Sequence, residues 1–117
     1  MAQYMLLLYD DPSGWRQLSP EEMQKAIEKY IAWSNQARQS GFYLGSHKLA
    51  EDLGRVVRGG GKPRVTDGPY SETKEVLGGY CLIEAADYEQ ALQRCLDHPH
   101  LAYGGSIEVR QVDVLQP

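Results

Sequence analysis

The stretch QYMLLLY, residues 3–9, decides the fold of this chain, because its residues 4–9 form an unbroken apolar run. Two aspartates and a proline end the run. A short apolar run without alternation is typical of a central strand that is buried on both faces. The stretch VLGGYCLIE, residues 76–84, has the same character. We therefore expect two buried strands at the centre of a sheet, the second with a glycine pair where another group approaches closely.

A long helix is expected to follow the first strand. It begins at SPEE, residues 19–22, which supplies a capping serine, a proline for the first helical position and a glutamate at the capping-box spacing. It is expected to run to about Gln39 and to stop at Gly41. The residues between the strand and this helix, with an isolated Trp15, are expected to form a loop. The helix face expected to pack on the sheet consists of Met23, Ile27, Tyr30, Ile31, Ser34 and Ala37, with Trp33 and Tyr30 at its margin.

The middle of the chain shows strand and turn patterns. FYLGSHKLA, residues 42–50, predicts a strand that is broken or bulged near Gly45. RVVR and PRVTD flank the turn Gly59-Gly60-Gly61-Lys62, and this pattern predicts a β-hairpin. A glycine run can also bind phosphate, but that use needs a helix after the loop, and here a strand follows.

The C-terminal third predicts one more helix and one more strand. Asp87 is expected to cap the helix, which ends before Pro99. The final strand is SIEVRQVDVL, residues 106–115. Its alternation of apolar and polar residues slips between Arg110 and Gln111, which predicts a bulge at that point.

The order of these elements predicts the fold class. Without the hairpin the order is β-α-β-β-α-β, the ferredoxin-like pattern of an α+β protein, with two helices on one face of an antiparallel sheet. Residues 1–117 are expected to form a single domain. The other sheet face has no helix to cover it, while the apolar residues of the central strands point both ways. We therefore expect a homodimer that packs sheet against sheet.

The composition excludes several classes of protein. A chain of 117 residues with 42% hydrophobic and 24% charged residues is typical of a folded globular domain. The formal net charge of −4 gives no electrostatic reason to expect nucleic acid or an anionic membrane as a partner. We see neither a run of about 20 apolar residues nor a signal peptide. Cys81 and Cys95 stand in apolar company, which favours buried free thiols and a cytoplasmic protein.

Four segments together resemble a known family. They are YMLLLYDD, LSPEEM, VTDGPYSETKEVLGGYCLIEA and HPHLAYGGSIEVRQV, and they extend over nearly the whole chain. The chain resembles the YCII-related superfamily and, within it, the branch of DGPF-domain proteins, with Tyr70 where that branch usually has Phe. The resemblance implies a ferredoxin-like subunit that dimerises into an α/β barrel. It also implies a link to regulation, because DGPF relatives occur beside or fused to sigma factors of the extracytoplasmic-function type.

The resemblance also implies a chemistry. More distant YCII-type relatives look like small proton-transfer enzymes that use a His on the long helix and an Asp from an Asp-Pro pair after the second helix. These positions correspond to Tyr30 and to His98-Pro99 in this chain, so both depart from the pattern. Tyr30 and His98 are candidates for an altered acid–base pair, since an ordinary His pKa of about 6.5 suits proton transfer. The alternative is that His98 only caps or flanks a helix C-terminus.

Asp67 and Tyr70 are the other candidate site residues. Asp67 would place a carboxylate beside Tyr70 at the mouth of the sheet, although Asp in this position also commonly binds backbone amides in a turn. The three histidines have no tight spacing with Asp67 or Glu72, so we expect no metal and no other cofactor.

Two functional hypotheses remain open at this point. The first is a cofactor-free enzyme that moves protons on a small cyclic or aromatic substrate, in a pocket lined by Tyr30, Asp67, Tyr70 and His98. The second is a non-catalytic module that binds a small ligand or a protein, such as a sigma factor.

Overall fold

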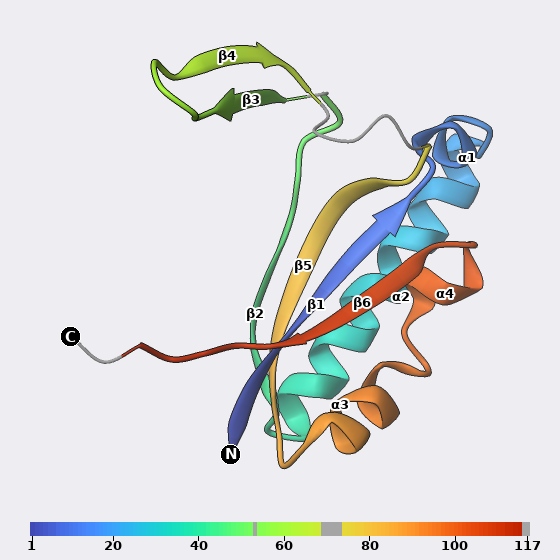
Figure 1. Ribbon diagram of the computed structural model, residues 1–117. Coiled ribbons are helices and arrows are strands. Elements are labelled where there is room, and N and C mark those ends of the chain that lie inside the picture. Colours follow the sequence, from blue (N-terminus) through green and yellow to red (C-terminus); the bar gives the residue numbers. More distant parts are fainter. Residues whose placement is uncertain (53, 69–73, 116–117) are drawn as a thin grey trace.

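A computed structural model describes residues 1–52, 54–68 and 74–115 of the chain (Figure 1). Within these residues a four-stranded antiparallel sheet has the order β2-β5-β1-β6, and a separate two-stranded sheet pairs β3 with β4. This arrangement is consistent with the ferredoxin-like α+β fold expected from the sequence. The elements are β1 (Ala2–Asp10), α1 (Pro12–Arg16), α2 (Pro20–Gln39), β2 (Tyr43–Lys48), β3 (Arg55–Arg58), β4 (Arg64–Asp67), β5 (Val76–Ala85), α3 (Tyr88–Cys95), α4 (Pro99–Ala102) and β6 (Ser106–Gln111).

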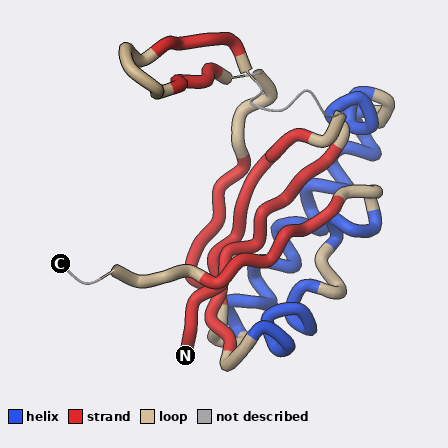
Figure 2. Tube along the Cα trace, viewed as in Figure 1, coloured by secondary structure: helices blue, strands red, loops and turns tan. Residues whose placement is uncertain are grey.

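The two apolar stretches form the central strands β1 and β5, as expected. Leu6 lies opposite Cys81 in the ladder, and Tyr4 lies opposite Ile83. All four side chains are buried against the helices, which cover one face of the sheet (Figure 2). The alternate residues of both strands, such as Met5, point to the other face, which no helix covers in the described structure. We call this second face the open face.

Helix α2 begins and ends where the sequence predicts. The Ser19 hydroxyl accepts from the Glu22 amide and the Glu22 side chain accepts from the Ser19 amide, which completes the capping box. Gly41 follows the helix with a φ of 84°, a conformation that glycine adopts without strain.

The buried face of α2 differs from the expected one. Ala26, Trp33 and Ala37 are the buried residues, whereas Ile27 is 45% exposed and Ile31 is 55% exposed. The helix is therefore rotated about its axis relative to the predicted stripe. Two alanines let the helix approach the sheet closely, and the large Trp33 ring then fills the space between them and buries more apolar area than an isoleucine would. The position of Trp33 at the margin was a wrong prediction.

Two short helices were not expected from the sequence. The predicted loop after β1 contains α1, which Asp11 caps by accepting from the Ser13 amide and which carries Trp15. After α3 the chain forms α4, and His98 is its N-cap residue. Helices of one turn show no apolar periodicity, so hydrophobic patterns cannot reveal them.

Of the two bulges predicted from the sequence, the one in β2 is confirmed and the one in the last strand is wrong. The register of β2 shifts between Tyr43 and Gly45, where Gly45 has a φ of 152°. The predicted bulge in the last strand is wrong, because the pairing of β6 with β1 is regular from Ser106 to Gln111. The strand ends there, so the change of alternation after Arg110 marks the end of a strand.

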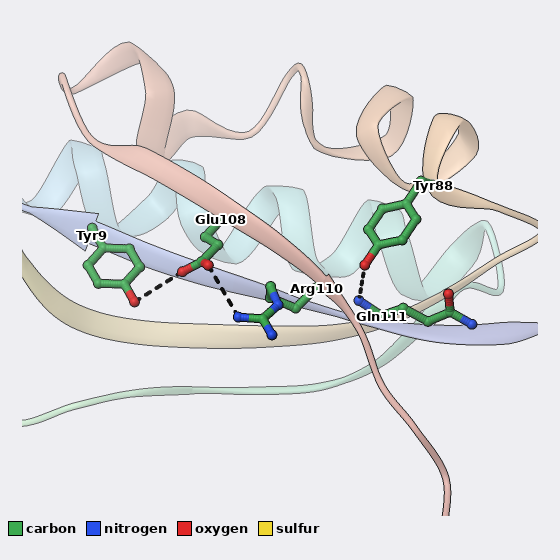
Figure 3. Close-up of polar contacts among 5 residues, drawn as sticks. All are labelled: Tyr9, Tyr88, Glu108, Arg110 and Gln111. Carbon is green, nitrogen blue, oxygen red and sulfur yellow. Dashed lines mark hydrogen bonds and ion pairs between the residues drawn. The ribbon is translucent and has the colours of Figure 1, made fainter.

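Helix α3 joins the core through small residues. Asp87 caps it by accepting from the Gln90 amide, as expected, and Ala91 and Cys95 are buried. The Tyr88 hydroxyl accepts from the backbone amide of Gln111, which ties α3 to the end of β6 (Figure 3). Both cysteines are buried free thiols, as expected. No helix within the described part of the chain is long and apolar enough to cross a bilayer.

The hairpin of β3 and β4 stands apart from the four-stranded sheet, on the side away from the helices (Figure 1). A hydrogen bond of 3.1 Å from the Gly68 amide to the Gly54 carbonyl closes its base. Val57 lies opposite Val65 in its ladder. We call residues 55–67 the arm.

The glycine pair in β5 allows a matched test of the close backbone approach that the sequence predicts at this pair. A Cβ at Gly79 would lie 2.9 Å from the backbone oxygen of His47, whereas a Cβ at Gly78 would lie 3.6 Å from the Asp10 carboxylate, an ordinary van der Waals contact. We expect Gly79→Ala to lower the free energy of unfolding by about 1–3 kcal/mol and Gly78→Ala to change it much less, as measured by urea denaturation. Equal effects of the two substitutions would contradict this packing.

Candidate functional site

Histidine and aromatic side chains gather at the end of the sheet where β1 finishes and β6 begins. Helices α1 and α4 both lie at this end (Figure 1). Tyr30 comes from α2, Trp15 from α1, and His98 and His100 from the cap and the body of α4. The Trp15 and Tyr30 ring centroids are 6.0 Å apart, and the Tyr30 and His100 centroids are 6.1 Å apart.

His100 forms the central contact of this group. Its ring is 4% exposed, and its Nδ1 lies 2.8 Å from the Tyr30 hydroxyl while its Nε2 lies 2.7 Å from the Tyr9 backbone carbonyl. A carbonyl can only accept, so the Nε2 atom carries a proton. In the neutral ring Nδ1 is then the acceptor, and the Tyr30 hydroxyl donates to it. We call this chain of two hydrogen bonds the His100 bridge.

Gly105 makes room for the His100 bridge. A Cβ at this position would lie 2.3 Å from Nε2 of His100 and within 2.7 Å of two ring carbons. The Gly105 amide also donates to the His100 carbonyl at 3.0 Å. The turn between α4 and β6 therefore needs a glycine here because the imidazole occupies the space of a side chain.

His98 has a structural environment that differs from that of His100. Its Nδ1 accepts from the His100 amide at 3.0 Å, and its ring packs on Trp33 with centroids 4.5 Å apart. Burial, together with the neighbouring His100, lowers the pKa of His98 to about 4, although Asp97 acts in the opposite direction. His98 is thus neutral at pH 7 and caps the N-terminus of α4, whereas the sequence suggested the C-terminus of a helix as its alternative role.

Tyr30 keeps its proton at neutral pH. Burial raises the pKa of Tyr30 well above its ordinary value, and the charge of Asp10 and the nearby Tyr103 raise it further. Asp10 is held in place by the Trp15 indole, which donates to its carboxylate. Tyr30 is therefore a protonated phenol that lies between a carboxylate and an imidazole.

The structure brings together only part of the predicted site. The rings of Tyr30 and His98 are in edge contact, with centroids 5.5 Å apart, but the Tyr30 hydroxyl forms its hydrogen bond with His100. Asp67 lies exposed at the end of β4, where its carboxylate pairs with Arg55 at 3.5 Å, and the arm does not carry it to Tyr30. Tyr70 and Glu72 lie outside the described residues.

Sequence reasoning missed His100, Gly105 and the pairing of Trp15 with Asp10. One signal for the local structure was present, because a proline favours the first position of a helix, and Pro99 therefore indicates an N-cap at His98. No local pattern indicates that His100 reaches Tyr30, since 70 residues separate them in the chain.

Two other features of the described residues bear on ligands. No group of three or more His, Cys, Asp or Glu side chains in this part of the chain is arranged to hold a metal ion. A cleft of about 140 Å³ lies between α2 and α3, with Trp33, Gln36, Arg94 and Asp97 among its lining residues. Pockets for drug-sized ligands usually measure about 300–1,000 Å³, so this cleft suits only a very small molecule.

Comparison with known proteins identifies relatives over almost the whole chain. A family model described as the YCII-related domain matches residues 2–115. The chain is also 29% identical over 117 residues to the uncharacterized protein R00369 of Rhizobium meliloti (strain 1021). That alignment covers 97% of this chain and 94% of the relative.

The His100 bridge can be tested through Gly105. We expect Gly105→Ala to displace the His100 ring, break its hydrogen bond to the Tyr9 carbonyl and lower the free energy of unfolding by about 1–3 kcal/mol in urea denaturation. Gly59→Ala is the matched control, because a Cβ at Gly59 meets nothing within 4 Å. A loss of stability no greater than that of the control would show that the imidazole is not confined in this way.

The low pKa of His98 predicts a pH dependence with a definite sign. A His has a pKa of about 6.5 in an unfolded chain. Between that value and about 4 the unfolded chain binds a proton that folded His98 does not, so stability is fully present above pH 6.5 and falls as the pH drops toward 4.

We expect His98→Asn to make this fall shallower by up to about 1.4 kcal/mol per pH unit, since asparagine keeps the N-cap but does not titrate. Urea denaturation of both proteins at pH 7, 6 and 5 measures the difference. Parallel curves would contradict a buried neutral His98.

Proposed function

The chain belongs to the YCII-related family, and we propose that it is a cofactor-free enzyme that moves protons on a small cyclic or aromatic substrate. The His100 bridge is the observation that carries this proposal. In the bridge a protonated phenol donates to an imidazole whose tautomer is defined by its second hydrogen bond. A proton shuttle needs two such groups within hydrogen-bond distance. This assignment replaces the pair of Tyr30 and His98 by the pair of Tyr30 and His100.

The bridge supports a balanced proton transfer. The Tyr30 oxygen takes a proton from a substrate carbon while its own proton passes to Nδ1 of His100, so a C–H bond breaks, the substrate becomes an enolate and the imidazole becomes an imidazolium. The other ring proton of His100 stays on Nε2, which donates to the Tyr9 carbonyl throughout. The reverse transfer returns the proton to the same carbon or to another one, and the second outcome is an isomerisation.

The electrostatics of the site favour the return of the proton. The high pKa of Tyr30 disfavours a lasting tyrosinate, because burial and the negative charge of Asp10 both oppose a second negative charge. The phenol therefore passes its proton on to His100 as it receives another from the substrate. The proposal assigns Tyr30 as the group that contacts substrate and His100 as the group that exchanges protons with it.

We further propose that the enzyme is a cytoplasmic homodimer of the α/β-barrel type, built on the open face. The outward residues of the central strands include Met5, Leu7 and Leu82, which are only partly covered in one copy. Beside them the Tyr9 hydroxyl donates to Glu108, and Glu108 pairs with Arg110 (Figure 3). A second sheet packed on this face would remove the apolar side chains from water.

A second candidate function is a non-catalytic module that binds a protein in regulation, such as an extracytoplasmic-function sigma factor. The exposed arm favours this alternative, because a projecting hairpin with basic residues on it is a surface that a partner could bind. The link to sigma factors rests on the resemblance of the residues around VTDGPY to the DGPF branch.

The two functions can be separated by following proton exchange. A thermal-shift screen with small cyclic and aromatic acids, ketones and lactones first identifies ligands that raise the melting temperature. For each ligand, proton NMR in D2O then measures whether the protein catalyses the exchange of carbon-bound hydrogen. We expect Tyr30→Phe to bind such a ligand but to slow the exchange by about 10²–10⁴-fold, the usual contribution of a general acid or base.

Tyr80→Phe is the control for this experiment. The Tyr80 hydroxyl also contacts a histidine, with 2.6 Å to Nδ1 of His47, but this pair lies on the open face. The control should exchange substrate hydrogen at the rate of the original protein. Ligands that bind without any exchange, or an exchange rate that Tyr30→Phe leaves unchanged, would contradict the proposed enzyme.

A further inference from the structure

Within the described residues, the arm carries two valine side chains that remain largely exposed. Val57 and Val65 lie opposite each other in its ladder and are 66% and 67% exposed. A single two-stranded hairpin is marginally stable in water, because it has no apolar layer to bury. The exposed valines of the arm would therefore be stabilised by contact with another surface.

The two faces of the arm differ in chemistry. Side chains alternate along each strand, so Val57 and Val65 share one face with the Arg55–Asp67 ion pair. Val56, Arg58, Arg64 and Thr66 share the other face. Arg58 and Arg64 lie directly opposite each other, and two like charges in this position oppose pairing. The valine face is the one that a second surface can cover without burying these two charges.

The charge of the chain indicates which partner fits. The arm holds four basic residues and one acidic residue, a formal charge of +3, within a chain whose total is −4. The rest of the chain therefore carries −7. A second copy of the chain presents a strongly acidic body to the basic arm of the first, and the attraction between the two is mutual in a two-fold arrangement.

The position of the arm supports the same partner. It projects on the side of the molecule away from the helices, beyond the end of β2 (Figure 1). The open face of the sheet is also turned away from the helices (Figure 2). A second copy seated on the open face would thus lie on the side to which the arm extends.

We propose that the arm docks on a second copy of this chain, with Val57 and Val65 packed against the partner copy and the net positive charge of the arm attracted by the acidic body of that copy. This inference goes beyond the proton-transfer activity. It assigns the inserted hairpin a role in joining two copies, in addition to the packing of sheet on sheet.

Isotope-filtered NMR tests the contact directly. A sample that mixes ¹³C-labelled and unlabelled full-length chains reports only those proton contacts that cross between copies. We expect the methyl groups of Val57 and Val65 to show such contacts and those of Val56, on the opposite face, to show few or none. An absence of intermolecular contacts from Val57 and Val65 would overturn the proposal, whether the chain is a monomer or the arm binds something else.

Matched lysine substitutions give a second and independent measurement. We expect Val65→Lys to raise the dimer dissociation constant at least tenfold in sedimentation equilibrium, because it buries a charge in the contact, and its neighbour Thr66→Lys to change it less than threefold. Circular dichroism of both variants checks that they are folded. Equal effects of the two substitutions, or a monomeric original chain, would overturn the proposal without bearing on whether Tyr30 catalyses hydrogen exchange.

Discussion

The imidazole of His100 is the contact on which this end of the molecule depends. It joins α2 to β1 by accepting from Tyr30 and donating to the Tyr9 carbonyl, and β6 can begin beside it only because Gly105 has no side chain. Both ring nitrogens are thereby satisfied in a buried place, where an unpaired polar group would cost about 1–3 kcal/mol. The interaction that stabilises the fold is thus the same one that defines the tautomer of the histidine and the direction of the Tyr30 hydrogen bond.

The helical face and the open face of the sheet have separate roles in this account. Proton chemistry is assigned to the helical side, where burial holds Tyr30 protonated and His98 neutral. Assembly is assigned to the open face and the arm. Tyr9 belongs to both sides, because its carbonyl accepts from His100 while its hydroxyl donates to Glu108 on the open face (Figure 3).

Most of the fold could be predicted from the sequence, because the deciding signals are local. Two apolar runs identified the central strands, a capping box identified the start of α2, and a glycine-rich turn identified the arm. The errors came from features that depend on tertiary packing. Helix α2 buries Trp33 instead of Ile27 and Ile31, since the rotation of a helix follows the fit of its side chains against the sheet. The hydrogen bond of Tyr30 with His100 could not be predicted for the same reason: α4 is a single turn, and only the folded chain shows that it directs His100 toward Tyr30.

The tautomer of His100 tests the His100 bridge and the proposed proton transfer. Long-range ¹H–¹⁵N correlation spectra of the uniformly labelled protein distinguish the two neutral tautomers of each histidine. We expect the neutral ring of His100 to carry its proton on Nε2, and we expect Tyr30→Phe to shift the Nδ1 resonance, because that atom loses its donor. A proton on Nδ1 of His100, or an Nδ1 resonance that Tyr30→Phe leaves unchanged, would contradict the bridge and the proton transfer that is built on it.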